Sequence, residues 1–158
     1  MSALQRNGIS IMTDQSAKLA DSGEWLPIPE AQRQAREEIL RTLRKAPPVI
    51  SGITSHLAEA QGKGVRTLLL LNTASDEQGL VPHDAVLTAA AIEMFHLATL
   101  VHDDVIDDSP LRRGIPTVQS KFGKKQAVIC GDYLLCLAAG ERSLCRQRHR
   151  HSLGQGSL

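Results

Sequence analysis

The sequence predicts an all-α protein, and three observations support this fold class. Alanine and leucine are abundant while aromatic residues make up only 3% of the chain, a composition that favours helix over sheet. Apolar residues recur at helical spacing in several segments, and no segment of strand length alternates between apolar and polar residues. With 158 residues, the chain is long enough for one domain with a hydrophobic core.

The first half of the chain predicts a leader and two helices. Residues 1–24 are polar and aperiodic, and we expect them to form a flexible leader. The prolines of "LPIP" disfavour regular helix, so the first helix is predicted over residues 30–46, where charged and apolar residues fall on opposite sides. The proline pair at 47–48 ends this helix and opens a second one over roughly residues 49–60.

A glycine-punctuated loop and two further helices follow. The loop "QGKGVR" leads into "TLLLLNTAS", a short and nearly all-apolar segment that we expect to form a buried helix. The longest helix is predicted over residues 85–107, "AVLTAAAIEMFHLATLVHDDVID", with Asp84 as its N-cap. Pro110 stops it, because proline is excluded from helix interiors.

After Pro110, "RRGIPT" is predicted to be loop, and residues 125–140, "KQAVICGDYLLCLAAG", are predicted to form the last helix. Residues 141–158 lose the apolar period abruptly and are rich in arginine, histidine and small residues. We therefore expect a disordered tail.

Composition excludes several functional classes. Lysine and arginine total 18 against 17 aspartates and glutamates, which gives a net charge of +1. No bulk charge therefore points to nucleic acid or to a membrane surface. The three cysteines lack metal-type spacing and fit a reducing compartment. No signal peptide or apolar run long enough to span a bilayer is evident, so a cytoplasmic location is predicted.

Four carboxylates, Asp103, Asp104, Asp107 and Asp108, lie at the end of the most hydrophobic segment. On a helix, Asp103 and Asp107 are one turn apart and share a stripe with His96. We therefore expect these three side chains to enter one hollow, opposite the loop at residues 63–66. Like charges at this spacing destabilise a helix by about 0.2–0.5 kcal/mol, and the helix dipole disfavours anions at this end. Two carboxylates so arranged suit Mg²⁺, which is held by one or two carboxylates plus waters and phosphates. The alternative is a solvated helix end paired with the arginines at 112 and 113.

The stretch "HDDVIDDSPLRRGIPTVQSKFG", followed by "GDYLL", resembles the first aspartate-rich region of the trans-isoprenyl diphosphate synthases. The long-chain heptaprenyl- and octaprenyl-type enzymes are the most similar, and the resemblance runs from about residue 36 to residue 138. The five residues "DDVID" are weakly specific alone, but the ordered succession of motifs is specific. The resemblance implies an antiparallel helical bundle of the isoprenoid synthase type, of which residues 25–140 would form the N-terminal half.

The resemblance also assigns roles to single residues. It implies that Asp103 and Asp107 bind Mg²⁺, with Asp104 assisting, and that these three aspartates are catalytic. Arg112 matches the arginine for the allylic diphosphate. The residues that match the site for isopentenyl diphosphate are Lys63, Arg66, His96 and Arg113. The loop "GKGVRT" departs from the family pattern at Gly64 and Thr67, where a basic residue and a proline are usual.

The implied reaction is the Mg²⁺-dependent condensation of isopentenyl diphosphate with an allylic diphosphate to give a polyprenyl diphosphate. Ala98 and Thr99 are small, precede Asp103 by about one turn and match positions that border the path of the growing product in this family. The resemblance therefore implies a product longer than farnesyl, with Phe95 as the floor of that path. No second aspartate-rich motif follows Gly140. We therefore expect an uncovered apolar face, association into a homo- or hetero-oligomer, and doubtful activity of the chain alone.

Two alternatives stay open. The first is a metal-dependent phosphohydrolase of the HD type, suggested by "VHDD" on a helix, with His56, His83 or His96 as further ligands. The second is a non-catalytic subunit of a heteromeric synthase.

Overall fold

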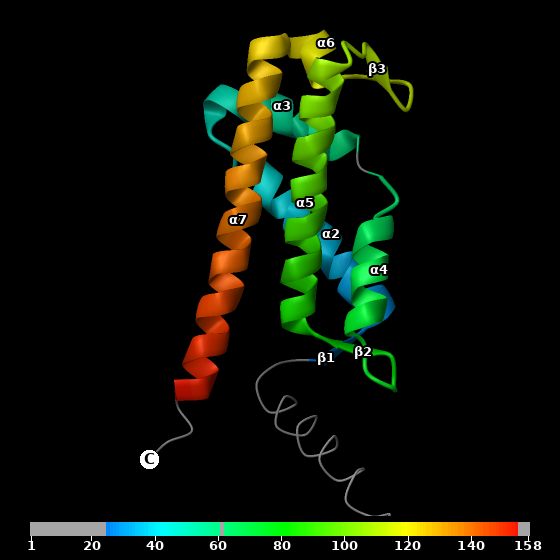
Figure 1. The fold of residues 1–158 in the computed structure, drawn as a ribbon, viewed down its shortest axis with the longest axis vertical. Helices are drawn as coiled ribbons and strands as arrows, with labels where there is room; N and C mark the ends of the chain where they lie inside the picture. Colours follow the sequence, from blue (N-terminus) through cyan, green and yellow to red (C-terminus); the bar gives the residue numbers. More distant parts are fainter. Residues whose placement is uncertain (1–24, 61, 155–158) are drawn as a thin grey trace, which may run out of the picture.

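The computed structural model describes residues 25–60 and 62–154, with the side chains of the last 14 of these left aside (Figure 1). It confirms the predicted all-α class, since six helices dominate this part of the chain. The helices and strands are β1 (Trp25–Pro27), α2 (Ile28–Arg44), α3 (Pro48–Glu59), α4 (Val65–Ala74), β2 (Leu80–Pro82), α5 (His83–Ile106), β3 (Leu111–Arg112), β4 (Ile115–Pro116), α6 (Val118–Phe122) and α7 (Lys124–Gly154).

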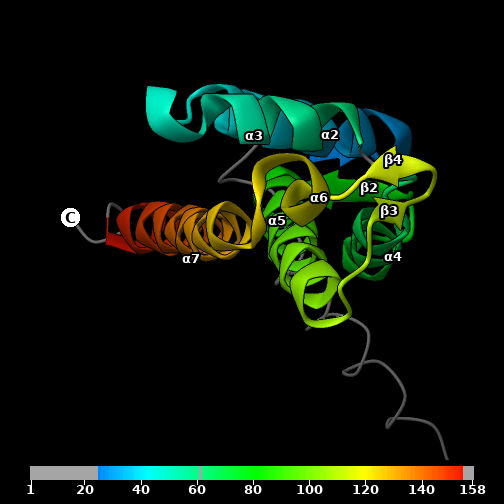
Figure 2. The ribbon, with the colours of Figure 1, turned by 90° about the horizontal axis from the view of Figure 1, so that it is seen from above.

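The described helices form two layers around α5. Helices α4, α5 and α7 lie in one row, and each runs antiparallel to its neighbour (Figure 1). Helices α2 and α3 form a second layer across one face of that row, as the view from above shows (Figure 2). Helix α5 packs against α7, α4 and α2, so it is the central element that positions everything else.

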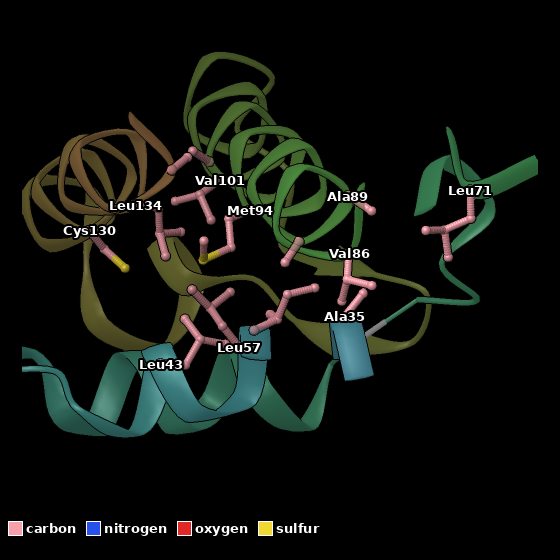
Figure 3. Packing of buried hydrophobic residues seen from close by; sticks show 14 of the residues in the cluster. Ala35, Leu43, Leu57, Leu71, Val86, Ala89, Met94, Val101, Cys130 and Leu134 are labelled. Carbon is pink, nitrogen blue, oxygen red and sulfur yellow. The ribbon is translucent and has the colours of Figure 1, made fainter. Parts of the chain in front are cut away.

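The hydrophobic core lies between the two layers (Figure 3). Large side chains converge there from four helices, among them Leu43 of α2, Leu57 of α3, Met94 of α5 and Leu134 of α7. Each such side chain stabilises the fold by about 1.5–3 kcal/mol through burial. The alanines of α5 are also buried, which lets the neighbouring helices approach closely. One of them is Ala98, so the expectation that Ala98 borders the path of a growing product is wrong.

Helix α5 is, within residues 25–60 and 62–154, the one helix that is long and apolar enough to cross a membrane. Its hydropathy has another explanation, because it contacts helices α2, α4, α6 and α7, and 44% of its most apolar 18-residue stretch is buried inside the protein. The core helix of a water-soluble bundle passes the same test of length and composition.

The helix starts differ from the predicted ones in two places. Helix α2 begins at Ile28 with a proline in its first turn, where the missing N–H costs nothing. The N-cap of α5 is Pro82, and Asp84 lies inside the first turn instead of capping it. Both starts follow a short antiparallel ribbon that pairs Trp25–Pro27 with Leu80–Pro82. Strands of three residues are too short for a period of two to be visible in the sequence.

The expectation that α4 is buried is wrong. Val65 and Leu69 are largely exposed, with 65% and 66% of their surface accessible, and only Thr67 and Leu71 of this helix are buried. Helix α4 lies at the end of the row (Figure 2), so only one of its sides faces the core. The apolar run correctly predicts a helix here, but it does not predict how many sides of that helix are covered by neighbouring elements.

The predicted disordered tail is not observed over residues 141–154. The backbone of α7 continues to Gly154, because the segment contains no proline and many good helix formers. Residues 155–158 and the predicted leader at 1–24 lie outside the described residues.

The glycine of "GDYLL" explains the close contact between α5 and α7. A Cβ atom added to Gly131 would lie 2.2 Å from Nε2 of His102, so the imidazole occupies the space that a side chain would need. Nε2 of His102 lies 3.4 Å from the carboxylate of Asp132 and 3.3 Å from the carbonyl oxygen of Val128. The motif thus provides both the clearance and the partner for one histidine of the central helix.

We expect Gly131→Ala to lower the free energy of unfolding by roughly 1–2 kcal/mol, because the imidazole must leave its place on α7. Gly140→Ala is the matched control, since an added Cβ there meets nothing. It should stabilise the protein by about 0.5–1 kcal/mol, because alanine is the better helix former. Urea denaturation of both variants measures the difference. Equal stability of the two would contradict the steric explanation.

Candidate functional site

A cavity of about 710 Å³ is lined by residues of both layers. Its walls come from α2, α3, α5, the segment 62–67 and the hairpin β3–β4. Residues far apart in the sequence therefore meet here. Six of the eight residues that the resemblance assigned line this cavity, namely Lys63, Arg66, His96, Asp104, Arg112 and Arg113.

Positive charge dominates the cavity wall. The cationic side chains are Arg33, Arg36, Lys63, Arg66, Arg112 and Arg113, whereas the acidic ones are Glu93 and Asp104. Among the described residues, no ion pair or side-chain hydrogen bond joins Lys63, Arg66 or Arg113 to the rest of the protein. The cavity is therefore suited to a small molecule with several negative charges.

The two glycines of the "GKG" segment have separate structural functions. A Cβ atom on Gly62 would lie 2.6 Å from a guanidinium nitrogen of Arg113, so the absence of a side chain lets Arg113 lie against the loop. Gly64 is the N-cap of α4 and has a φ of +66°, which glycine adopts without strain. No acidic residue neutralises the first turn of α4. Its free N–H groups therefore add to the attraction for an anion.

The "RRG" motif forms a tight β-hairpin rather than the predicted loop. Leu111 and Arg112 pair with Pro116 and Ile115, so Arg113 and Gly114 are the two turn residues. Both have positive φ, +53° for Arg113 and +81° for Gly114, as a type I′ turn requires. Arginine at such a position is strained, and strain of this kind is concentrated at functional sites.

We expect Arg113→Asn to change stability and binding in opposite directions. Asparagine tolerates positive φ, so the free energy of unfolding should rise by roughly 0.5–1 kcal/mol. Loss of the guanidinium should weaken binding of inorganic pyrophosphate, a small anion of the kind that suits the cavity, about tenfold, the effect of one charge-assisted hydrogen bond. Urea denaturation and calorimetric titration measure the two quantities. A variant that is both less stable and unaltered in affinity would contradict the functional explanation of the strain.

Asp104 holds Arg112 in place. Nε of Arg112 lies 3.0 Å from both carboxylate oxygens of Asp104, and its Nη2 lies 2.8 Å from one of them. Asp104 is buried, with 5% of its surface exposed. Both of its oxygens are thus engaged by one guanidinium, so its structural role is to position Arg112. Asp108, which we had considered as a partner of an arginine, instead pairs with Lys124 at 2.8 Å.

Asp103 and Asp107 are exposed and lie outside the cavity wall. The expectation that they share a hollow with His96 and the 63–66 loop is therefore wrong for the two aspartates. Leu97, Leu100 and Asp104 mark the side of α5 that faces the cavity, about a quarter turn around the helix from Asp103. Helical spacing predicts which side chains of α5 point in the same direction, but it does not predict which side of α5 the other helices cover.

The donor set of Asp103 and Asp107 nevertheless fits Mg²⁺. Neither carboxylate has an ion-pair partner within the described part of the chain, and the N–H of Asp107 donates to the carbonyl of Asp103 at 2.8 Å. No group of three or more histidines, cysteines, aspartates and glutamates able to hold a metal occurs in this part. Two carboxylates are the usual protein contribution for magnesium, since waters and phosphates supply the other ligands.

Three supporting residues were missed by the sequence analysis. Nε2 of His56 donates to the carbonyl oxygen of Pro116 at 2.7 Å, which ties the hairpin to α3. The amide of Gln119 donates to the carbonyl oxygens of Asp104 and Ser109 at 2.8 and 3.0 Å. Thr117 donates to the carbonyl oxygen of Ser109 at 2.7 Å. The "PTVQ" segment could have indicated an anchoring role, but only tertiary contacts identify its partners.

His96 stays neutral down to a lower pH than an ordinary histidine does. Its partial burial, and then the positive charge of Arg66, lower its pKa below the usual 6.5, although Glu93 acts in the opposite direction. Because the folded pKa is lowered, the protein should lose stability as the pH falls from 6.5 through the lowered value. A bound diphosphate supplies negative charge and should raise the pKa of His96 again.

We expect NMR titration of the histidine rings to detect this behaviour. The His96 signal, identified by its absence in His96→Gln, should titrate below pH 6.5 in the free protein. Inorganic pyrophosphate should move its midpoint upward. A midpoint that pyrophosphate does not move would show that the anion binds elsewhere.

The part of the chain that forms most of the cavity wall matches a known protein family. The family model of polyprenyl synthetases matches residues 47–150, more than half of the chain and the part that supplies the hairpin and most of the cavity wall. The chain belongs to the polyprenyl synthetase family. This match includes part of the segment that we had expected to be an atypical tail. The family assignment also leaves the HD-type phosphohydrolase without support, because no suitable metal-binding group accompanies "VHDD" in the described residues.

The relatives are prenyl-transferring enzymes. The chain is 42% identical over 106 residues to a nonaprenyl diphosphate synthase of Mycobacterium tuberculosis, which covers 65% of this chain and 31% of the relative. It is 39% identical to component 2 of the heptaprenyl diphosphate synthase of Bacillus subtilis over 98 residues. This aligned segment covers 62% of this chain and 28% of the relative.

Solved structures of polyprenyl synthetases share the fold. The heptaprenyl diphosphate synthase of Staphylococcus aureus gives a TM-score of 0.65 with 30% identity, over 73% of this chain and 37% of the other. A decaprenyl diphosphate synthase of Rhodobacter capsulatus gives 0.62 with 31% identity, over 80% and 38%. These polyprenyl synthetases have the isoprenoid synthase fold, and the chain spans about a third of the length of the relatives that it matches.

Proposed function

We propose that the chain takes part in the condensation of isopentenyl diphosphate with an allylic diphosphate, which makes a polyprenyl diphosphate. The observation that carries this proposal is the convergence of Lys63, Arg66, His96 and Arg113 on one cavity. Family membership supports the same reaction, because the relatives are named as prenyl transferases and polyprenyl diphosphate synthases.

The cavity is the proposed site for isopentenyl diphosphate. Lys63 and Arg66 flank the N-terminus of α4, and Arg113 projects from the strained turn of the hairpin. These cations would hold the diphosphate, and guanidinium groups bind phosphate oxygens in pairs. His96, with its lowered pKa, would donate or accept a hydrogen bond without adding a further charge. Leu97 and Leu100 give the same wall an apolar part for the hydrocarbon.

The proposed site for the allylic diphosphate is the acidic end of α5. Asp103 and Asp107 would hold Mg²⁺, which, when bound, would stabilise the negative charge of the leaving diphosphate. Arg112 is aligned for the same leaving group by its contacts with Asp104. Asp104 would therefore act through Arg112, because both of its oxygens are already engaged.

These residues would act chiefly by positioning. Asp104 fixes the guanidinium of Arg112, whose pKa Asp103 and Asp107 also raise, and the hairpin places Arg113 in the cavity wall. The two diphosphates would thus be held apart while their hydrocarbon ends meet, which favours attack of the isopentenyl double bond on the allylic carbon. Electrostatic stabilisation of the departing diphosphate would supply the rest.

Assembly with a second protein is part of the proposal. Ile92 and Phe95 of α5 and Ile129 of α7 are large apolar residues that stay exposed in the described part of the chain, and such exposure favours association. Two relatives are named as components of a heptaprenyl diphosphate synthase. A non-catalytic subunit of a heteromeric synthase is therefore the second candidate function. The free thiols of Cys130 and Cys136 fit a cytoplasmic location.

The test is a prenyl-transfer assay with the purified chain, Mg²⁺, farnesyl diphosphate and radiolabelled isopentenyl diphosphate. Extension of the primer by the chain alone would support the catalytic function. Extension only after addition of a full-length synthase that co-purifies with the chain would favour the subunit function. Lack of both, together with no binding of isopentenyl diphosphate, would contradict the proposal.

A further inference from the structure

Helix α2 contributes a guanidinium to the cavity that neither the motifs nor the resemblance assigned. The positions of α2 that line the cavity are Pro29, Gln32, Arg33, Arg36 and Ile39. They are three or four residues apart, so one side of the helix faces the cavity throughout. The amide nitrogen of Gln32 lies 3.8 Å from where a Cβ of Gly64 would be. Helix α2 therefore runs directly beside the cationic loop, and Arg36 follows Gln32 by one turn.

Arg36 and Arg33 differ in their partners. Arg33 is held on both sides, by Glu30 through two hydrogen bonds and by Glu37. Within the described residues, Arg36 has no ion pair and no side-chain hydrogen bond, although it is exposed and lines the same cavity. Of the six cations in the wall, Arg33 and Arg112 are thus neutralised by carboxylates. Arg36, Lys63, Arg66 and Arg113 are left to repel one another.

We propose that Arg36 is a fourth cationic ligand of the diphosphate that occupies this cavity. The inference rests on the proposed function and extends it, because it adds a binding residue from a helix that carries no motif. Four like charges around one cavity are unfavourable when it is empty, and a diphosphate relieves this repulsion with its own charge. The long arginine side chain reaches such a group from the edge of the cavity and bonds two of its oxygens.

The test is calorimetric titration of the full chain with inorganic pyrophosphate and, separately, with isopentenyl diphosphate, both without Mg²⁺. Arg36→Gln should weaken the binding of each by about five- to tenfold, the loss of one charge-assisted hydrogen bond. Arg36→Lys should recover part of the affinity, because it keeps the charge but not the paired donors. Arg33→Gln is the matched control, because Arg33 lies on the same helix and lines the same cavity. The affinity of this variant for each probe should differ by less than about twofold from that of the unaltered chain, because the charge of Arg33 is already neutralised.

Each outcome separates this inference from the proposed function. If Arg66→Gln weakens binding but Arg36→Gln does not, the inference is wrong and the proposed function stands. An effect of Arg36→Gln on isopentenyl diphosphate alone would also overturn it, because a diphosphate ligand must respond to both probes. If the unaltered chain binds neither probe, the inference and the proposed function fail together. Circular dichroism of each variant verifies that the helices are retained.

Discussion

Replacing Asp103 by asparagine is expected to lower the rate of the proposed prenyl transfer about a thousandfold, equivalent to about 4 kcal/mol in the activation free energy. The substitution removes one of the two carboxylates that form the proposed magnesium site. Among the described residues, these two carboxylates are not part of a group of three or more histidines, cysteines, aspartates and glutamates able to hold a metal. The fold should be unaffected or slightly more stable, because the repulsion between Asp103 and Asp107 disappears. The measurements are prenyl transfer and the Mg²⁺-dependent rise in melting temperature.

Asp108→Asn is the matched control for this prediction. Asp108 belongs to the same acidic cluster and is also exposed, but its carboxylate pairs with Lys124. Its substitution should leave both the rate and the magnesium response within about twofold of the unaltered protein, since exposed ion pairs contribute little. If Asp103→Asn behaved like Asp108→Asn, the magnesium site would have to be sought elsewhere.

The second large effect is expected for Asp104→Asn, which should lower the free energy of unfolding by about 2–3 kcal/mol. Asparagine keeps the shape of the side chain but removes the charge that both Nε and Nη2 of Arg112 contact. Arg112 keeps 39% of its side chain exposed, so water replaces part of the lost interaction and the cost stays below that of a fully buried pair. Urea denaturation measures the change.

A double-mutant cycle tests the cause of that loss. Arg112→Gln combined with Asp104→Asn should cost less than the sum of the two single changes, because the pair is lost only once. Asp107→Asn, one turn after Asp103 and without an ion-pair partner in the described chain, should leave stability unchanged or raise it by a few tenths of a kcal/mol. Strict additivity of the two single changes would show that Asp104 stabilises the protein by some other contact.

The sequence was sufficient for the helices because their signals are local. Proline pairs, glycines and the period of apolar residues located α3 and α5 to within one or two residues. Motifs far apart in the sequence were also expected to contribute to one site, and Lys63, Arg66, His96 and Arg113 do line one cavity. Such assignments follow from ordered motifs, in which the spacing along the chain carries the information.

Other features depended on contacts between distant segments. The sequence did not reveal that Asp104 contacts Arg112, that His56 fastens the hairpin, or that Arg36 faces the cavity. It also suggested a buried α4 and a shared hollow for Asp103 and Asp107, and both suggestions were wrong. In each case the helical period predicts only how side chains are arranged around their own helix. It does not predict which neighbouring helix or loop they will contact.

The sequence by itself determined the fold class, the family resemblance and the residue types able to bind a diphosphate and a divalent cation. The tertiary structure alone decided which of those residues share a cavity, which carboxylate positions an arginine, and which cations are left without a partner. The physical reason is that propensity and periodicity act within a few residues of the chain. Burial and ion pairing depend on how α2 and α5 and the β3–β4 hairpin pack against one another.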